Sequence, residues 1–382
     1  MTPSEEFVAK LCKNTFLSLW SLPNPLGKKG KELCDLLVVC DPDVIIFSVK
    51  DINIIDSGNI DVDVERWIKR AIDASVSQIY GAERIIGISE RITLADRETT
   101  IDLPPSKNRN IYRVAVAFGR KDEYPLIYGN MGKGFVHVMD DRSIQVILKE
   151  LDTITDFIHY LKTKEEFIAQ GQLPLAGDEE DYLAVYMQYG KSFPVPCDLL
   201  VLDNDLWLTY KNDKEYIYEK AQNESSYLWD SLIEQYCDDF EKGKLNITRN
   251  DFEVAIRQMA RENRYARRIL SGSFMEVIGT KGNPSNIRAR MIRSSYDQSI
   301  VYVILKAPMD DREYRRRELT LRCAVARYKN KDAHTVIGIA TEKYNGASGF
   351  SLDICYMHLP VWEDKHNDKM EEIIKELNYF NN

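Results

Sequence analysis

The sequence lacks the features that would place the chain in a membrane or direct it out of the cell. None of its apolar stretches approaches the roughly 18 uninterrupted residues that a membrane-spanning helix needs. The first residues also lack the basic segment followed by an apolar run that marks a secretory signal. We therefore expect a cytoplasmic protein. With 44% hydrophobic and 29% charged residues, the 382-residue chain has enough apolar side chains to form a buried core.

Common metal-binding and nucleotide-binding motifs are also missing. The seven cysteines include no CxxC pair, and Cys34, Cys40 and Cys355 lie in apolar runs. We expect reduced core cysteines, without a disulfide framework or a zinc site. The five histidines show neither metal-ligand nor triad spacing, and no Walker-type or dinucleotide-type glycine pattern occurs. The sequence therefore does not predict a nucleotide hydrolase.

Positive charge is scarce in the chain as a whole but concentrated in one part of it. The formal net charge of −9 argues against a protein whose entire surface binds phosphates. Residues 257–322, however, contain 15 Lys and Arg against 7 Asp and Glu, a net charge of +8, which leaves −17 for the remainder. Charges of opposite sign are thus segregated along the sequence.

The length of the chain predicts two domains. We expect an α/β domain over residues 1–150 with a mixed sheet flanked by helices, a helical connector and linker over 151–181, and an α+β domain over 182–382. In the first two segments, apolar periodicity predicts helices over residues 2–20, 64–80, 143–148 and 155–169, and strands over 33–39, 44–49, 84–89, 111–118 and 135–139. Gly81 is expected to stop the second helix. In the last segment, apolar periodicity predicts strands over 199–202 and 206–210 and several strands between 287 and 357. It also predicts helices over 225–240, 250–270 and 364–380.

Residues 30–50 contain the pattern with the clearest chemical content. Two short apolar strands are joined by the turn Asp41-Pro42-Asp43. If this turn is the midpoint of a hairpin, position 35 pairs with about position 50, and opposed side chains lie on the same face. Asp35 and Lys50 would then meet, either as a structural ion pair at the end of the sheet or as part of a site.

This hairpin, with one helix before it and one after it, resembles the restriction-endonuclease-like PD-(D/E)xK nuclease superfamily over about the first third of the chain. In that family an aspartate at the start of one strand and an acid-x-lysine triplet on the next strand hold Mg²⁺, and the lysine positions or activates water. Asp35 matches the aspartate and Lys50 the lysine, whereas Ser48 stands where the family has Glu, Asp or Gln. The phrase ELCDLLVV…VIIFSVK is also similar to uncharacterised bacterial members associated with antiviral defence.

Ser48 leaves a gap in this implied metal site, because a hard cation prefers carboxylate oxygens. Some members of the family draw a glutamate from the first helix, where Glu5 lies at the edge of the buried face; alternatively, Glu5 only caps its own helix. Glu32 is a second candidate, although strand alternation places it on the opposite face from Asp35 unless the strand begins later or bulges. Gln78, at the edge of the apolar stripe of the following helix, either faces the site or is solvated.

Two groups of basic residues are candidates for binding a phosphate backbone. Lys28, Lys29 and Lys31 flank a glycine-containing loop before the hairpin. The second group begins with five arginines spaced to populate neighbouring faces of one predicted helix: Arg257, Arg261, Arg264, Arg267 and Arg268. Further along the chain it continues with Arg288, Arg290, Arg293 and Arg315 to Arg317. The alternative for the second group is a solvated face, or pairing with acids such as Glu262, Glu313 and Glu318.

Two hypotheses follow from these residues and from the resemblance. The first is a nuclease dependent on Mg²⁺ or Mn²⁺ that cuts nucleic acid, with DNA as the expected substrate, and acts as a homodimer or with a partner subunit of a defence system. The second is a degenerate nuclease fold that binds nucleic acid or a partner protein without cutting. The absent carboxylate at Ser48 and the acidic net charge favour the second hypothesis.

Overall fold

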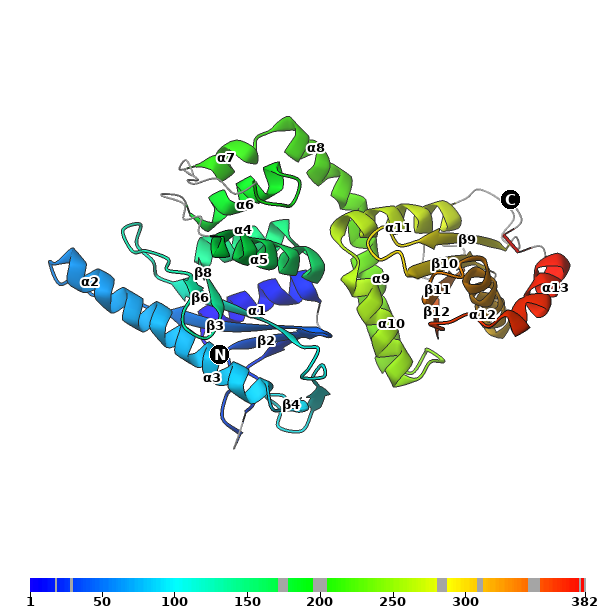
Figure 1. The fold of residues 1–382 in the computed structure, drawn as a ribbon, viewed down its shortest axis with the longest axis horizontal. Coiled ribbons are helices and arrows are strands. Elements are labelled where there is room, and N and C mark those ends of the chain that lie inside the picture. The colour runs from blue at the N-terminus through cyan, green and yellow to red at the C-terminus, as the bar shows by residue number, and fades with distance from the viewer. Residues whose placement is uncertain are drawn as a thin grey trace. The chain divides into compact units, whose positions relative to one another are not determined.

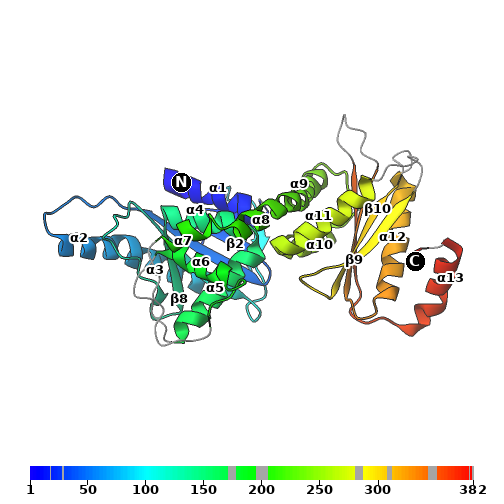
Figure 2. The same ribbon diagram turned by 90° about the horizontal axis from the view of Figure 1, so that it is seen from above.

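The computed structural model divides the chain into two compact units, Met1–Ile217 and Tyr218–Asn382. It describes all residues except 18, 28–29, 171–177, 195–204, 280–286, 308–311, 343–350, 378 and 381–382. None of the helices in this described part combines the length and the apolar sequence that crossing a membrane requires. Each unit contains one main sheet with helices on both faces (Figures 1 and 2), so the chain is of mixed α and β structure.

The sheet of the first unit is mixed, as the sequence predicts. Its strand order is β1-β2-β3-β6-β8-β7. The strands are β1 (Ser21–Pro23), β2 (Leu36–Cys40), β3 (Asp43–Asp51), β6 (Asn110–Phe118), β7 (Gly129–Asn130) and β8 (Phe135–Asp140). β1, β2 and β3 form an antiparallel meander, whereas β6 runs parallel to β3 and β8 runs parallel to β6. A separate small hairpin joins β4 (Arg91–Thr93) to β5 (Thr100–Asp102).

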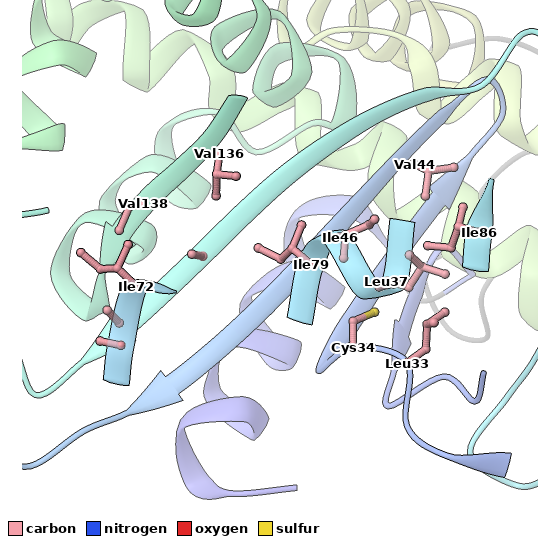
Figure 3. Close-up of a cluster of buried hydrophobic side chains, with 14 of the residues drawn as sticks. Leu33, Cys34, Leu37, Val44, Ile46, Ile72, Ile79, Ile86, Val136 and Val138 are labelled. Atoms are coloured by element: carbon pink, nitrogen blue, oxygen red, sulfur yellow. The ribbon is translucent and has the colours of Figure 1, made fainter. Parts of the chain in front are cut away.

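Helices cover both faces of this sheet (Figure 1). One face carries a long helical segment made of α2 (Ile60–Trp67), a π turn (Ile68–Asp73) and α3 (Ala74–Ile86), and the other carries α1 (Pro3–Phe16), α4 (Asp141–Glu150) and α5 (Ile154–Ala169). Figure 3 shows the core on the α3 side, where Leu37 and Ile46 pack with Ile79. On the other side Phe47 stacks on Phe157 of α5. Burial on both faces explains why β2 and β3 are almost continuously apolar.

Two predictions for the helical segment are wrong. Gly81 does not end the helix, which continues to Ile86, and the predicted strand over residues 84–89 is instead the last turn of α3 and the turn after it. The apolar run of Ile85 and Ile86 is buried by helix packing, with Ile86 fully buried against the sheet. A short apolar run has the same appearance in a buried helix as in a strand.

The first unit also extends beyond the boundary predicted at residue 181. Glu179 and Glu180, which the sequence assigns to the end of the linker, begin α6 (Glu179–Gln188) and are buried. The fully buried ammonium of Lys164 on α5 pairs with the Glu179 carboxylate. This pair ties α6 to α5, whose Phe157 packs on the sheet, so the predicted connector belongs to the first unit. The unit continues through α7 (Leu206–Tyr210), a helix where the sequence predicts a strand, into α8 (Lys214–Asn223). The strand predicted over 199–202 lies outside the described residues.

The second unit has a four-stranded sheet of order β12-β11-β10-β9, which agrees with the strands predicted between residues 287 and 357. The strands are β9 (Arg288–Arg293), β10 (Ile300–Lys306), β11 (Thr335–Thr341) and β12 (Leu352–His358). α12 (Arg312–Lys329) is the crossover between the parallel strands β10 and β11. It covers one face and packs against α13 (Asn367–Leu377) on its outer side, while α9 (Tyr227–Glu241), α10 (Arg249–Arg261) and α11 (Arg264–Ile278) cover the other face (Figure 2).

The predicted helix over residues 250–270 is in fact two helices. α10 ends at Arg261 and α11 begins at Arg264, with the side chain of Asn263 accepting a hydrogen bond of 2.8 Å from the backbone N–H of Ala266. Asparagine is a favoured N-cap, so the break has a sequence signal that helical periodicity alone overlooks.

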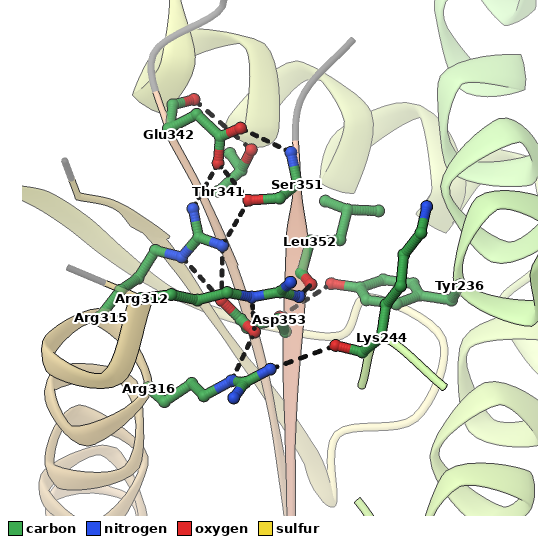
Figure 4. A network of polar contacts seen from close by, with 10 residues as sticks. All are labelled: Tyr236, Lys244, Arg312, Arg315, Arg316, Thr341, Glu342, Ser351, Leu352 and Asp353. Atoms are coloured by element: carbon green, nitrogen blue, oxygen red, sulfur yellow. Dashed lines mark hydrogen bonds and ion pairs between the residues drawn. The ribbon is translucent and has the colours of Figure 1, made fainter. Parts of the chain in front are cut away.

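A buried ionic network joins α12 to β12 (Figure 4). The carboxylate of Asp353, 2% exposed, accepts hydrogen bonds from Nε of Arg312, Arg315 and Arg316 at 2.9, 2.7 and 2.8 Å. Arg315 is fully buried and also donates to Glu342 and to the Ser351 hydroxyl. Arg315 and Arg316, which the sequence places in a phosphate-binding group, therefore have internal partners.

Glu262, between α10 and α11, makes the stability of the second unit depend on pH. Its carboxyl group is 1% exposed and accepts hydrogen bonds from Ser294 Oγ at 2.8 Å and Tyr302 Oη at 2.9 Å. Burial raises the pKa of Glu262 to about 7 against the opposing effects of these two bonds and of Arg267. The folded state thus keeps a proton that the unfolded chain loses near its ordinary pKa of 4.5, so stability falls as pH rises from 4.5 to about 7 and stays lower above that.

We expect Glu262→Gln to remove much of this dependence. Between about pH 5 and pH 8 the free energy of unfolding of the wild type should fall by roughly 2–3 kcal/mol more than that of the variant. Urea denaturation followed by circular dichroism across the pH range measures this difference. The exposed Glu241→Gln serves as the control and should follow the wild type. Parallel curves for Glu262→Gln and wild type would exclude this role.

Candidate functional site

Polar side chains gather on the α3 side of the β2–β3 hairpin, at its open end. Ser48 and Lys50 of β3 alternate with Val49, and therefore lie on the same face as Ile46, which packs in the core beneath α3. Asp35 directly precedes β2 and lies two residues before Leu37, which belongs to the same core. Strand alternation thus places the polar side chains of Asp35, Ser48 and Lys50 on the same face of an otherwise apolar hairpin.

The predicted pairing of Asp35 with position 50 is wrong by two residues. The observed register pairs Leu36 with Phe47 and Cys40 with Asp43, so continuing it places Asp35 opposite Ser48. The turn consists of two residues, Asp41 and Pro42, instead of the three in the prediction. Because side chains alternate with a period of two, a shift by two residues leaves them on the same face. Asp35 and Lys50 therefore still meet, as diagonal neighbours.

Asp35, Ser48, Lys50 and Gln78 form a closed hydrogen-bonded group. Lys50 Nζ lies 3.4 Å from Asp35 Oδ2 and donates at 2.5 Å to Gln78 Oε1. Gln78 Nε2 in turn donates at 2.9 Å to Asp35 Oδ1, and Ser48 Oγ donates at 2.8 Å to Gln78 Oε1. The backbone N–H of Val49 also donates to Asp35 Oδ2. The amide of Gln78 thus orients both the carboxylate and the ammonium.

Gln78 belongs to α3, and the structure places its side chain in this group and not in solvent. Ile79, the next residue, is fully buried in the core against the hairpin, which fixes the rotation of the helix at this point. The π turn at Ile68–Asp73 lies upstream, between Gln78 and the anchored Trp67, whose Nε1 donates to the carbonyl of Pro125 at 3.3 Å. π turns occur frequently next to functional sites.

The carboxylate of Asp35 is 4% exposed and is satisfied by these donors. A buried carboxylate requires such compensation, because burying an unpaired charge costs several kcal/mol. Sequence reasoning did not include the Val49 N–H among these donors, since a backbone donor has no residue signature. Lys50 is 26% exposed, so its ammonium is the part of the group that solvent and a ligand can reach.

Glu32 comes within hydrogen-bonding reach of Asp35. The strand begins only at Leu36, so Glu32 lies outside it. The alternation of side chains along the strand therefore does not force Glu32 onto the face opposite Asp35. Desolvation, a hydrogen bond with Asp35 and the charges of Asp35 and Glu5 raise the pKa of Glu32, while Lys50 lowers it. The three carboxyl groups therefore repel one another electrostatically, a situation that a bound cation would relieve.

Glu5 caps its own helix, in agreement with the structural alternative for this residue. Its Oε2 accepts a hydrogen bond of 2.9 Å from the backbone N–H of Thr2, and the hydroxyl of Thr2 caps the N–H of Glu5 in return. The side chain nevertheless lies near enough to Glu32 for its charge to raise the pKa of Glu32. Glu5 thus contributes charge to the site while its carboxylate is committed elsewhere.

Two acidic groups of this site, Asp35 and Glu32, could act as ligands of a metal ion. In the described part of the chain no three histidine, cysteine or acidic side chains lie close enough together to enclose a metal ion. Mg²⁺, however, usually binds through one or two carboxylates and completes its shell with waters and substrate phosphates. Asp35 and Glu32 supply two neighbouring carboxylates. Ser48 donates its proton to Gln78 and supplies no charge.

The predicted arginine group does not lie on one helix, and part of it is buried. Arg264 and Arg267 are 5% and 1% exposed, and both guanidinium groups bind the carboxylate of Asp230. Arg268 packs on the ring of Tyr265 and pairs with Glu219 at 3.3 Å. The prediction that Arg264 and Arg267 contact a phosphate backbone is therefore wrong, because internal acids already neutralise their charges.

The other basic candidates are more dispersed. Arg257 and Arg261 lie on α10, are half-buried and have interaction partners. Lys31 is exposed before the hairpin, whereas Lys28 and Lys29 lie outside the described residues. Of these candidates, Lys31 belongs to the segment that also carries Glu32 and Asp35.

Comparison of the chain with protein-family models, with curated proteins and with solved structures finds no match. The geometry and chemistry of the hairpin site are therefore the basis for inferring its function.

Proposed function

We propose that the first unit is a metal-dependent nuclease domain that hydrolyses phosphodiester bonds, with DNA as its substrate. The observation that carries this proposal is the contact of Asp35 with Lys50, both oriented by Gln78, next to the carboxyl group of Glu32. A buried aspartate paired with a lysine that solvent can reach, at the end of a sheet, combines a cation ligand with a donor for an anionic substrate.

The order of the elements supports a restriction-endonuclease-like architecture for this domain. Helix α1 is followed by the antiparallel meander β1, β2 and β3, by the helical segment ending in α3, and by β6 parallel to β3. The resemblance in the hairpin implies the same succession of helix, hairpin and helix, with the aspartate and the lysine on the two central strands. A role in bacterial antiviral defence, with a second copy or a partner subunit, is part of this proposal.

Each residue of the group has a distinct role in the proposed reaction. Asp35 and Glu32 would hold Mg²⁺, which supplies positive charge to a phosphodiester oxygen and a bound water of lowered pKa. The Lys50 ammonium donates to the attacking water or to the oxygens on which negative charge develops. Gln78 keeps Lys50 and Asp35 in register through its two hydrogen bonds.

A cleavage assay across metal concentrations tests the proposal. We expect the full chain to nick supercoiled DNA with Mg²⁺ or Mn²⁺. Glu32→Gln should raise the metal concentration for half-maximal activity by more than about tenfold, since the loss of even an outer-shell partner of a metal site has an effect of that size. Glu6→Gln, an exposed change on α1, is the matched control and should leave the metal dependence unaltered.

The outcomes separate the nuclease proposal from the assignment of Glu32. A wild-type chain that cuts no duplex DNA, single-stranded DNA or RNA with either metal would contradict the nuclease proposal. Cleavage with an unchanged metal dependence in Glu32→Gln would contradict the ligand role alone.

Ser48 favours a second candidate function, which is binding without cutting. Its hydroxyl completes the hydrogen-bonded group by donating to Gln78, so the serine finds its partner within the protein and brings no charge to a cation. Under this alternative, calorimetry would detect neither Mg²⁺ nor Mn²⁺ binding, while nucleic acid or a partner protein would still bind. Metal binding that is lost in Asp35→Asn would count against it.

A further inference from the structure

In the second unit, one face of α12 and one face of β12 bring two cysteines together beside a cavity. Arg316, Thr320 and Cys323 follow one another at spacings of four and three residues, and therefore line one face of α12. Asp353 and Cys355 alternate on β12 and share the face that meets this helix, as the contact between Arg316 and Asp353 requires.

The two sulfur atoms are neighbours because a glycine leaves room for one of them. Gly338 of β11 is the cross-strand partner of Cys355. A Cβ atom at position 338 would lie 2.5 Å from Cys323 Sγ, which is too close for two non-bonded atoms. The sulfur can therefore occupy this position only because residue 338 is glycine. The Cys323 thiol thus sits directly over Gly338, next to the Cys355 thiol on the neighbouring strand.

Only one of the two thiols lies at the cavity. The cavity has a volume of about 290 Å³, and its wall includes Cys355, Thr320, Arg316 and Thr248. Cys355 is partly exposed, whereas Cys323 is fully buried in the core beneath α12. A small polar oxidant therefore has room beside Cys355 and no direct route to Cys323. The sequence predicts Cys355 to be a reduced core cysteine, without a cavity beside it.

The surroundings of Cys355 favour its thiolate. The hydrogen bond from Cys323 and a contribution from the Thr320 hydroxyl lower the pKa of Cys355, although burial opposes them. The single proton of Thr320 is shared between Cys355 and the Arg316 carbonyl oxygen, 3.0 Å away, so Cys323 is the main donor. By contrast, burial raises the pKa of Cys237, on α9 of the same unit, to about 12.

We propose that Cys355 is a peroxide-reactive thiol and that Cys323 is its resolving partner, so that oxidation joins α12 to β12 through a disulfide. The proposal is independent of the nuclease activity, because every residue it uses belongs to the second unit. It adds a modification site whose co-reactant is a hydroperoxide.

The proposed oxidation of the two thiols to a disulfide proceeds in two steps. The Cys355 sulfur attacks one oxygen of hydrogen peroxide, the O–O bond breaks, and the departing hydroxide takes the thiol proton to give water and a sulfenic acid. The Cys323 sulfur then attacks the Cys355 sulfur, the S–O bond breaks, and the departing hydroxide takes the Cys323 proton to give a second water. The two thiols lose two electrons in total, and the peroxide is reduced to two molecules of water.

Peptide mapping of the oxidised full chain tests this proposal. The reduced protein is treated with hydrogen peroxide, quenched with an alkylating reagent and digested without reductant. We expect a cross-linked pair of peptides that contains Cys323 and Cys355 and that disappears on reduction. In Cys323→Ser the sulfenic acid should persist at Cys355 and be trapped by a dimedone-type reagent, whereas Cys355→Ser should form no cross-link.

Cys237→Ser is the matched control and should retain the cross-link between Cys323 and Cys355. Alkylation of the unoxidised protein provides a measurement on the wild type alone, in which Cys355 should react at least about tenfold faster than Cys237. Equal alkylation rates, a cross-link between other cysteines, or no cross-link in the wild type would each overturn the proposal.

Discussion

Asp35→Asn is expected to lower the rate of phosphodiester hydrolysis by roughly 10³-fold, the size of effect that follows the loss of a charged group from a preorganised site. Asparagine keeps the shape of the side chain but offers one acceptor oxygen where the carboxylate has two. Those two oxygens accept from the Val49 N–H, Lys50 and Gln78. The amide group of asparagine would direct N–H donors toward at least one of these donors, and it supplies no charge for a cation.

Single-turnover cleavage at saturating metal and enzyme measures this effect on the chemical step. Asp102→Asn is the matched control, since Asp102 lies on β5 of the same unit and is 75% exposed in a surface pair with Arg91. The control should keep the wild-type rate. An Asp35→Asn variant that folds and cuts within about twofold of the wild type would remove Asp35 from the reaction.

Asp353→Ala is expected to destabilise the second unit by roughly 3–5 kcal/mol, the cost of removing one partner from a buried ion pair. The change would leave Arg312, Arg315 and Arg316 without their shared acceptor. Arg315 has no exposure to solvent and would keep Glu342 as its remaining carboxylate partner. The like charges of the three guanidinium groups would then oppose one another, most strongly at Arg315, because only this arginine is fully removed from water.

Denaturant unfolding of the second unit measures the loss, with Asp332→Ala as the matched control. Asp332 also pairs with an arginine, Arg293, but it is 71% exposed. Exposed pairs of this kind contribute about 0–1 kcal/mol. Equal losses in the two variants would show that the burial of the Asp353 network adds nothing to stability.

The sequence predicts the first unit well where burial dictates the pattern. Strands buried on both faces produce the apolar runs of β2, β3, β6 and β8, and the alternation rule brings Asp35 and Lys50 to one face even though the turn is a residue shorter than predicted. The rule reaches Asp35, which directly adjoins β2, but it does not extend to Glu32, which lies four residues before the first residue of the strand. Where a strand begins depends on hydrogen bonds to neighbouring strands, which local sequence does not encode.

The density of arginines in the second unit led to a wrong prediction of phosphate contacts for a different reason. A helical arginine has the same appearance in the sequence whether it faces solvent or a buried acid. Asp230 and Asp353, the acids that neutralise Arg267 and Arg315, lie more than 30 residues away in the chain. The pairing of Cys323 with Cys355 depends likewise on Gly338, on a third element. Such partners become visible only when the fold assembles distant segments.

The π turn at Ile68–Asp73 makes the site sensitive to the number of residues in the long helix. Each residue rotates an α-helix by about 100°. Trp67 is fixed upstream by Pro125 and Tyr124, so losing one residue from the turn would swing Gln78 through that angle, away from Asp35. Related chains should therefore conserve the length of this segment and the apolar character of the buried Ala71 and Ile72, and vary in composition at the exposed Lys69, Arg70 and Asp73.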